Sequence, residues 1–185
     1  MGRLIVVTGG ARSGKSTFAE KLAKDSKDEV IYIATSIPFD DEMKIRIKKH
    51  VEQRPKEWKT IEAYRDIDQQ LENEKNENIV FLLDCVTIMI TNIMLEIQVD
   101  WDNARDEEME KVEEVVKLQI NKILKTAEKK DAVFIMVTNE VGMGIVPENR
   151  LTRVFRDIAG RMNQILAGAA DEVYLCVSGI PVKIK

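Results

Sequence analysis

Near its start the chain reads Leu4-Ile5-Val6-Val7-Thr8-Gly9-Gly10-Ala11-Arg12-Ser13-Gly14-Lys15-Ser16, an apolar segment that runs directly into a glycine-rich loop. The loop fits G-x-x-x-x-G-K-[S/T], in which backbone N–H groups and a lysine hold nucleotide phosphates. Apolar residues then recur at helical spacing, at Phe18, Ala19, Leu22 and Ala23. This strand–loop–helix order disfavours a chance match by an ordinary glycine turn, because the loop's N–H groups and the helix N-terminus together form an anion site. We therefore predict that Lys15 reaches the β- and γ-phosphates and that the Ser16 hydroxyl binds Mg²⁺.

Further apolar segments follow at intervals along the chain. They are rich in Val, Ile, Leu and Phe, do not alternate with polar residues, and comprise Val30–Thr35, Ile79–Leu83, Ala132–Thr138 and Val173–Ser178. Such segments are typical of strands covered on both faces of a parallel sheet. A helix face between them is marked by Met109, Val112, Val116, Ile120, Ile123 and Ala127. We predict a doubly wound α/β fold with a mostly parallel sheet, and a single domain over residues 1–185, since no repeat or linker divides the chain.

Composition narrows the class of protein. The 185 residues are 44% hydrophobic and 32% charged, with a net charge of −4, which gives no electrostatic support to nucleic-acid binding. Apolar runs are far shorter than the roughly 20 residues that cross a bilayer, and no signal-peptide pattern is present, so we expect a cytoplasmic protein without a membrane span. Cys85 and Cys176 lack metal-ligand spacing and are expected to be buried free thiols. The acidic stretch Asp100–Glu114 is interpreted as the solvated start and outer face of a helix.

Asp84 ends the apolar segment Ile79–Leu83. A carboxylate at the C-terminal end of a buried strand lies where α/β folds bind ligands, and it is suited to hold Mg²⁺ directly or through water. The alternative is a turn or helix-capping residue. A phosphate-loop protein needs such an acid, so we favour the metal role.

The chain contains one histidine, His50, within the segment Asp40–Arg54. Residues at i, i+4, i+7 and i+8 share one helical face there, namely Met43, Ile47, His50 and Val51. The spacing alone therefore favours a packing role for His50. Near a triphosphate, however, a neutral imidazole is also able to attack phosphorus and form a covalent intermediate. The adjacent basic cluster of Lys48, Lys49 and Arg54 is either a solvated face or a phosphate contact.

A polar, glycine-containing run follows the segment Ala132–Thr138. It reads Asn139-Glu140-Val141-Gly142-Met143-Gly144-Ile145-Val146-Pro147-Glu148-Asn149. Its position after a predicted strand favours a substrate-facing loop, but a plain connection explains the composition equally well.

Taken together, these motifs resemble one enzyme family, the bifunctional adenosylcobinamide kinase/adenosylcobinamide-phosphate guanylyltransferases of cobalamin biosynthesis. The resemblance is carried by Gly9–Ser16, Ile33–Ser36, Asp40–Met43, His50–Pro55, Leu83–Thr87, Thr91-Asn92, Thr138–Asn149 and Phe155–Gln164. It covers essentially the whole chain. Many proteins share the phosphate loop, whereas the Asn139–Asn149 run is highly specific. Met89 departs from the family, in which many relatives carry tryptophan, and we interpret this as variation in packing.

The resemblance implies a set of GTP contacts beyond the phosphate loop: Ala34, Thr35, Ser36, Val51, Glu52, Gln53, Arg54, Glu62 and Asp84. It also implies that His50 is the guanylylated histidine, in place of the packing role that spacing favours. The fold implied is a phosphate-loop NTPase of the RecA-like type, assembled as a homotrimer.

Two reactions are expected on this basis. In the first, ATP or GTP phosphorylates adenosylcobinamide, with Lys15, Ser16 and Mg²⁺ neutralising the transferred phosphoryl group. In the second, His50 takes GMP from GTP, releases pyrophosphate, and passes GMP to adenosylcobinamide phosphate to give adenosylcobinamide-GDP. Two alternatives remain open: a kinase that has kept only the first reaction, and a nucleotide-controlled switch protein.

Overall fold

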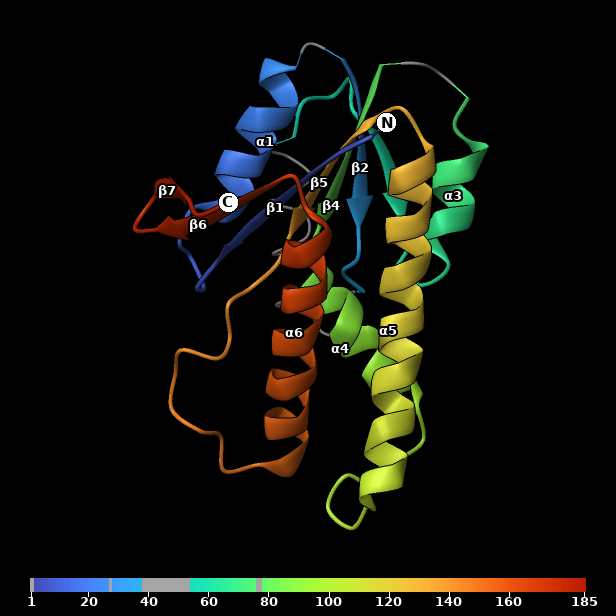
Figure 1. Ribbon diagram of the computed structural model, residues 1–185, viewed down its shortest axis with the longest axis vertical. Helices are drawn as coiled ribbons and strands as arrows, with labels where there is room; N and C mark the ends of the chain where they lie inside the picture. Colours follow the sequence, from blue (N-terminus) through green and yellow to red (C-terminus); the bar gives the residue numbers. More distant parts are fainter. Residues whose placement is uncertain (1, 27, 38–53, 76–77) are drawn as a thin grey trace.

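A computed structural model describes residues 2–26, 28–37, 54–75 and 78–185. Within these ranges seven strands form one sheet in the order β3-β2-β4-β5-β1-β6-β7 (Figure 1). The strands are β1 (Arg3–Gly9), β2 (Glu29–Ala34), β3 (Lys59–Glu62), β4 (Ile79–Asp84), β5 (Val133–Val137), β6 (Glu172–Val177) and β7 (Ile180–Lys183). All neighbours are parallel except β6 and β7, which are antiparallel. The five strands predicted from apolar segments are confirmed, each to within one residue at either end.

Both faces of the sheet are covered, which explains why its strands are apolar without alternation. Leu4 and Val6 of β1 point into a core with α3 (Ile67–Asn73), α4 (Val86–Glu96), α5 (Asp106–Lys129) and α6 (Arg150–Ala169). Ile5 and Val7 point the other way, into a smaller core with α1 (Lys15–Asp25). The doubly wound α/β prediction is therefore confirmed.

The helical crossover connections that the structure describes share one handedness. Connections that move toward the β7 side of the sheet, from β3 to β4, from β4 to β5 and from β5 to β6, carry the helices α3 to α6 on one face. The connection from β1 to β2 moves the opposite way and carries α1 on the other face. The connections that leave the neighbouring strands β1 and β5 therefore pass over opposite faces of the sheet, and β1 is the strand that leads into the glycine-rich loop.

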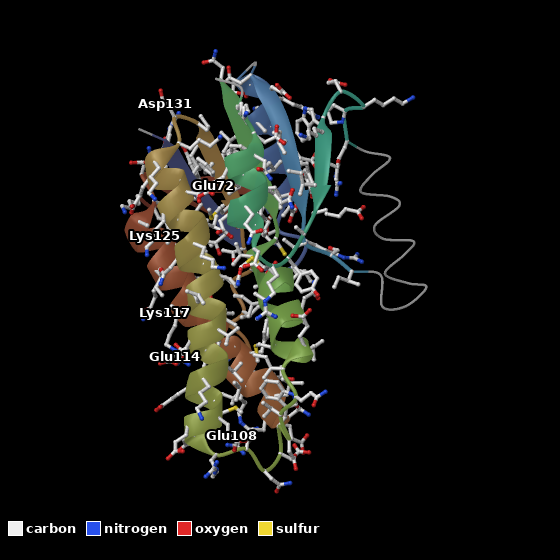
Figure 2. All side chains as sticks on the ribbon, turned by 90° about the vertical axis from the view of Figure 1, so that its right-hand side faces the viewer. Glu72, Glu108, Glu114, Lys117, Lys125 and Asp131 are labelled. Atoms are coloured by element: carbon white, nitrogen blue, oxygen red, sulfur yellow. The ribbon has the colours of Figure 1, made fainter. Side chains whose placement is uncertain are left out.

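Helix α5 confirms the predicted apolar stripe. Five of its six predicted positions are buried, and Met109 is partly exposed. Figure 2 shows the outer face, with Glu108, Glu114, Lys117 and Lys125 toward solvent. The helix begins only at Asp106, so residues Asp100 to Arg105 of the acidic stretch are not part of it. Asp100 lies in a turn instead, where its carboxylate accepts hydrogen bonds from Asn103. The helix expected over Asp40–Arg54 lies outside the described residues except for Arg54.

Other elements were not predicted. Strands β3 and β7 are exposed edges of the sheet, and helix α4 is apolar around most of its circumference, with seven buried residues out of 11. Met89 of α4 is fully buried, in agreement with a packing role. Within the described ranges, no helix combines the length and apolar character that a bilayer crossing needs.

Candidate functional site

The glycine-rich loop connects the C-terminal end of β1 to the N-terminus of α1, as predicted. Two neighbouring segments support it through backbone hydrogen bonds. Glu140 N donates to Gly9 O at 3.0 Å, and Gly179 N donates to Ser13 O at 2.9 Å. The loop's shape is therefore fixed from both flanking strands, β5 and β6, before any ligand is bound.

Two of the glycines are required by this shape. Gly14 has a φ of +90°, and a Cβ there would lie 2.9 Å from Gly179 Cα. A Cβ on Gly9 would lie 2.5 Å from the carbonyl oxygen of Cys176. Because both contacts are with backbone atoms, neither can be relieved by rotating a side chain, and a larger residue would displace the loop.

The loop and helix start offer several unused hydrogen-bond donors. Helix α1 has Gly14 at its N-cap, no side-chain cap and no acidic residue in its first turn. Lys15 is 8% exposed, and its Nζ donates to Gly10 O at 3.0 Å. Ser13 Oγ is buried without a hydrogen-bond partner among the described residues. A helix N-terminus with free N–H groups and a buried ammonium together favour an anion such as phosphate.

Asp84 lies at the same end of the sheet. Register aligns Ala34, Asp84, Val137 and Val7 in one row across β2, β4, β5 and β1. Alternation along β4 places Asp84 with Val80 and Leu82, on the face that α1 covers. The N-cap of α4 is Cys85, and no side chain caps that helix, so the structure does not support the capping alternative for Asp84.

A tyrosine and an arginine adjoin this carboxylate. The Tyr32 hydroxyl donates to Asp84 Oδ2 at 3.1 Å, and burial together with the Asp84 charge raises the pKa of Tyr32. The Arg54 guanidinium carbon lies 3.5 Å from the centre of the Tyr32 ring. The site thus holds a carboxylate and a guanidinium on one aromatic side chain.

Thr35 links the ends of β2 and β4. Its hydroxyl accepts from Cys85 N at 2.9 Å and donates to Cys85 O at 2.8 Å. Asn92 Nδ2 donates to Thr35 O at 2.7 Å. The Thr35 side chain is therefore engaged by protein groups, so any ligand contact from this residue would involve its backbone.

A second polar chain connects α4, the residues that follow β5, and α6. Thr87 Oγ1 accepts from Asn139 Nδ2 at 2.7 Å, and Asn163 Nδ2 donates to Asn139 O at 3.0 Å. Thr138 Oγ1 donates to Asn163 Oδ1 at 2.7 Å. This chain fixes the start of the Asn139–Asn149 loop, the same segment that supports Gly9.

The loop is less buried further on. Met143, Ile145 and Val146 are among its most exposed side chains, and Asn149 ends the loop as the N-cap of α6, accepting from Thr152 N at 3.1 Å. Both interpretations from sequence retain support, since one end of the loop adjoins the site and the other starts a helix.

An open cavity of about 440 Å³ adjoins these residues. Ala34, Thr35, Ser36 and Glu62 line it, together with Ile37, Ala63, Tyr64 and Arg65. The structure therefore brings together four residues that the resemblance implied as nucleotide contacts, although Glu62 is distant from Ala34 in sequence. The implied residues His50, Val51, Glu52 and Gln53 lie outside the described residues.

The two cysteines are buried free thiols, as predicted. Burial raises the pKa of Cys85 and of Cys176. Both thiols are thus protonated at neutral pH and are poor nucleophiles.

Some residues of the site were not predicted. Tyr32 lies within an apolar strand, and its hydroxyl was the only local signal that it needs a polar partner. Gly179 follows Ser178 in a turn, and this turn signal was present in the sequence without any indication that it meets the phosphate loop. The role of Asn163 is visible only in the folded structure, where α6 brings its side chain to Thr138 and Asn139, directly after β5.

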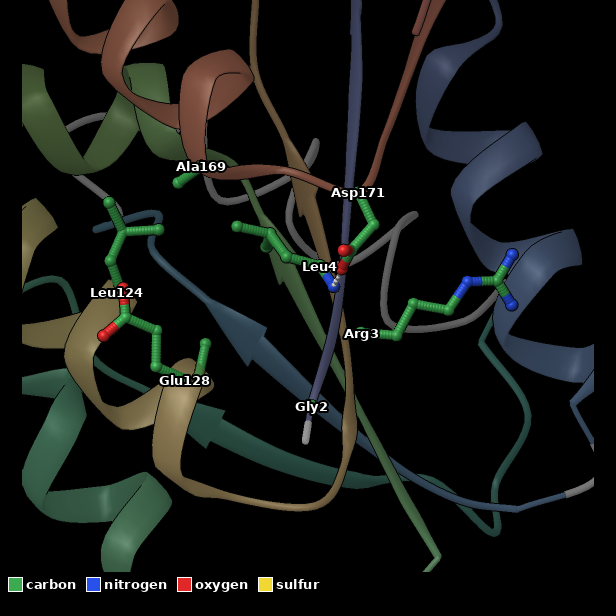
Figure 3. A pocket seen from close by; sticks show the side chains of 8 residues that line it. Gly2, Arg3, Leu4, Leu124, Glu128, Ala169 and Asp171 are labelled. Atoms are coloured by element: carbon green, nitrogen blue, oxygen red, sulfur yellow. Dashed lines mark hydrogen bonds between the residues drawn. The ribbon is translucent and has the colours of Figure 1, made fainter.

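A second cavity, of about 550 Å³, lies at the opposite end of the sheet (Figure 3). Its lining includes the carboxylates of Glu128 and Asp171, and Asp171 Oδ2 accepts from Leu4 N at 2.7 Å. Two carboxylates beside Arg3 do not suit a polyanionic ligand. The phosphate-loop end of the sheet is therefore the better candidate for a nucleotide site.

Comparison with known proteins agrees with this placement. Residues 5–184 match the family model described as cobinamide kinase / cobinamide phosphate guanyltransferase. The chain is 50% identical to the bifunctional adenosylcobalamin biosynthesis protein CobU of Escherichia coli K12, over 98% of this chain and 99% of that protein. It is 48% identical to CobU of Salmonella typhimurium LT2 over the same shares, and 36% identical to CobP of Pseudomonas aeruginosa PAO1 over 97% and 96%.

Among solved structures, a structural-study protein from Pyrococcus horikoshii OT3 aligns with a TM-score of 0.57 over 99% of this chain and 86% of that chain. The two are 8% identical, so this likeness concerns the fold alone. The match of the family model over nearly the whole length, with three relatives above 30% identity, establishes the relationship. The chain belongs to the cobinamide kinase / cobinamide phosphate guanyltransferase family of bifunctional enzymes.

Proposed function

We propose that this enzyme phosphorylates adenosylcobinamide with ATP or GTP and then transfers GMP from GTP, through a GMP-histidine at His50, to adenosylcobinamide phosphate. The products of the second reaction are adenosylcobinamide-GDP and pyrophosphate. Family membership supports the kinase and guanyltransferase activities in general. The nucleotides, the adenosylated corrinoid and the histidine intermediate are our proposal.

The observation that carries the proposal is the preformed phosphate loop at the end of β1. Its backbone is held by β5 and β6, and Lys15 is buried at the uncapped start of α1. A backbone held in place before a triphosphate binds needs little reorganisation, which favours electrostatic stabilisation of the reacting phosphoryl group.

In the kinase step, the corrinoid hydroxyl attacks the γ-phosphorus, the bond to the β-phosphate oxygen breaks, and the hydroxyl proton is released to water. The departing nucleoside diphosphate keeps that bond's electron pair. Lys15 and the α1 N-terminus stabilise the negative charge that develops on the phosphate oxygens. The Lys15 ammonium, which bonds to Gly10 O in this structure, would exchange that acceptor for a phosphate oxygen.

Mg²⁺ is the cofactor we propose, and the residues fit it. Ser16 and Asp84 offer a hydroxyl and a carboxylate, which are oxygen ligands of the kind Mg²⁺ prefers. Tyr32 is the one hydrogen-bond donor to the Asp84 carboxylate among the described residues, and it bonds to Oδ2. Among those residues no cluster of three or more His, Cys, Asp or Glu side chains forms a closed metal cage. Such a site suits an ion that completes its shell with water and phosphate oxygens, where it would neutralise phosphate charge.

In the guanylyl step, a neutral His50 nitrogen attacks the α-phosphorus of GTP, and the bond to the β-phosphate oxygen breaks to release pyrophosphate. A phosphate oxygen of the phosphorylated corrinoid then attacks the same phosphorus. The P–N bond breaks and its electron pair returns to the imidazole. The covalent intermediate divides one difficult displacement into two easier steps. His50 is the only histidine in the chain, and its assignment rests on the family resemblance.

We also propose a homotrimeric, cytoplasmic enzyme. The resemblance carries the trimer, and the biosynthetic role named for the relatives supports the localisation.

The decisive experiment is incubation with Mg²⁺ and [α-³²P]GTP. We expect label on the protein through a bond that is labile to acid and stable to base, as phosphoramidates are. His50→Ala should abolish the label and leave cobinamide-dependent consumption of ATP intact. Label that persists in a folded His50→Ala protein would contradict the histidine assignment.

The same assays separate the alternatives. An enzyme that consumes ATP with cobinamide but takes no label is a kinase alone. A protein that shows neither reaction while binding nucleotide is a switch protein.

A further inference from the structure

Tyr32 is an exception within its strand. It lies near the C-terminal end of β2 among apolar neighbours and is 2% exposed. A buried hydroxyl without a partner is costly, and the Tyr32 hydroxyl meets this need by donating to Asp84 Oδ2 at 3.1 Å. A phenol is protonated at neutral pH and a carboxylate only accepts, so the Tyr32 hydroxyl is the donor in this pair.

The ring of Tyr32 makes a second contact. Arg54 lies with its guanidinium carbon 3.5 Å from the ring centre, well within the roughly 6 Å range of cation–π attraction. One side chain thus contacts both the guanidinium and the carboxylate. Tyr32 therefore constrains where each lies relative to the other at the end of β2.

Arg54 has unused donors. Its Nε and Nη1 atoms are shielded from solvent and have no hydrogen-bond acceptor among the described residues. Buried guanidinium nitrogens without acceptors cost free energy, and an anion with several oxygens supplies the missing acceptors. Phosphate is the anion that the adjoining phosphate loop would bring to this end of the sheet.

We propose that Tyr32 is a positioning residue for nucleotide binding: its ring holds Arg54 so that the unpaired N–H groups donate to a phosphate oxygen of the nucleotide, and its hydroxyl orients Asp84 toward Mg²⁺. The inference rests on the proposed function and extends it to a residue to which no role has been assigned. The ring contacts Arg54 and the hydroxyl contacts Asp84. Removing the hydroxyl alone should therefore weaken the response to Mg²⁺, whereas removing the ring should also weaken binding of the nucleotide without Mg²⁺.

The test is a calorimetric titration with the α,β-methylene analogue of GTP, which cannot release pyrophosphate, at a series of Mg²⁺ concentrations. Tyr32→Phe keeps the ring and should raise the Mg²⁺ concentration for half-maximal binding about fivefold, the effect of one hydrogen bond of typical strength. Without Mg²⁺, the affinity of Tyr32→Phe for the analogue should stay within about twofold of the wild-type value, because the variant keeps the ring that contacts Arg54. Tyr32→Leu should also weaken Mg²⁺-free binding about fivefold.

Tyr174→Phe is the matched control, since Tyr174 also donates to a carboxylate, Glu172 Oε2, at 2.6 Å. That pair lies on β6, which β1 and β5 separate from β4 in the sheet, so both titrations should match the wild type. Arg54→Lys keeps the charge and loses the planar stack, and it should weaken Mg²⁺-free binding as Tyr32→Leu does. If Tyr32→Leu does not fold, this variant still tests whether the guanidinium contacts the phosphate.

The inference is overturned if Tyr32→Phe unfolds normally and needs the same Mg²⁺ concentration for half-maximal binding as Tyr174→Phe. It is also overturned if Arg54→Lys binds the analogue without Mg²⁺ as tightly as the wild type. The proposed function is judged separately, by wild-type labelling from GTP and by cobinamide-dependent ATP consumption. Loss of those reactions with the expected Tyr32 titrations would contradict the proposed function and leave the positioning role supported.

Discussion

The cluster around Glu172 allows a quantitative prediction of stability against pH. Glu172 begins β6 and accepts hydrogen bonds from Lys183 Nζ at 2.8 Å, from the Tyr174 hydroxyl and from Arg3. These three contacts, with Lys183 contributing most, lower the pKa of Glu172 from 4.5 to about 2. The carboxylate is 11% exposed, so the cluster links β6 to the edge strand β7 and to β1 across a largely buried charge.

The size and sign of the effect follow from linkage. At 1.36 kcal/mol per pKa unit, the lowered pKa corresponds to at most ~3.4 kcal/mol of stability. Arg3 and Lys183 are 58% and 52% exposed, so screening reduces this to about 1–2 kcal/mol. Because the folded-state pKa lies below the unfolded one, the contribution is complete above pH 4.5 and is lost as pH falls through 2.

Glu172→Gln should therefore lower the free energy of unfolding by about 1–2 kcal/mol at pH 7 and by roughly half as much at pH 3.5. Urea unfolding followed by tryptophan fluorescence at both pH values measures the difference. Glu57→Gln, a change at an exposed carboxylate in the turn before β3, is the control and should change stability little at either pH. A Glu172→Gln difference that is absent at pH 7, or that does not shrink at pH 3.5, would refute the assigned role of the carboxylate.

The remaining predictions concern the site. Lys15→Ala should impair both cobinamide phosphorylation and labelling by [α-³²P]GTP, since both need the same phosphate site; loss of only one activity would indicate separate nucleotide sites. Asp84→Asn keeps the size and removes the charge, so turnover and its Mg²⁺ dependence should fall more than stability; a large loss of melting temperature with near-normal activity per folded molecule would favour a structural role. Gly14→Ala should destabilise the fold by about 1–3 kcal/mol and weaken nucleotide binding, because its Cβ would meet Gly179 Cα at 2.9 Å; urea unfolding and titration with a GTP analogue measure both. If the GTP site is shared between subunits of a trimer, mixing Lys15→Ala and His50→Ala chains should restore some labelling, whereas a fully active monomer in light scattering would exclude both the trimer and the shared site.

The central strands were predictable because their environment is uniform. Segments such as Ile79–Leu83 and Val133–Val137 are covered on both faces, so every residue along them is selected for apolar character. Edge strands β3 and β7 lack this signal because their side chains are mainly exposed. Helix α4 was missed for the opposite reason, since burial around most of its circumference removes the helical period on which sequence analysis depends.

Site residues were likewise predictable only where their role is set by neighbouring residues in the sequence, and not where it depends on contacts between distant segments. Gly9 to Ser16 are contiguous, and their spacing alone specifies a phosphate loop. Tyr32 and Asp84 are 52 residues apart and meet only because Ala34 pairs with Asp84 in the register of β2 and β4. No local pattern encodes that register. Thr35 was implied only by the family resemblance. For Arg54 the sequence left a solvated face and a phosphate contact open, and the resemblance favoured the contact. Tyr32 was not found at all.

The topology explains why the candidate site lies at one end of the sheet. The chain leaves β1 over the face covered by α1, whereas it leaves the adjacent strand β5 over the face covered by α6. Connections that diverge to opposite faces leave a crevice between the two strand ends. Gly9 and Glu140 lie at its two sides and are joined by a single backbone hydrogen bond. At the opposite end of the sheet, Asp171 directly precedes β6 and its carboxylate accepts from Leu4 N near the start of β1, so that end presents negative charge. A phosphate is therefore favoured at the end where the connections diverge, because only that end combines free N–H groups, a buried lysine and an open helix N-terminus.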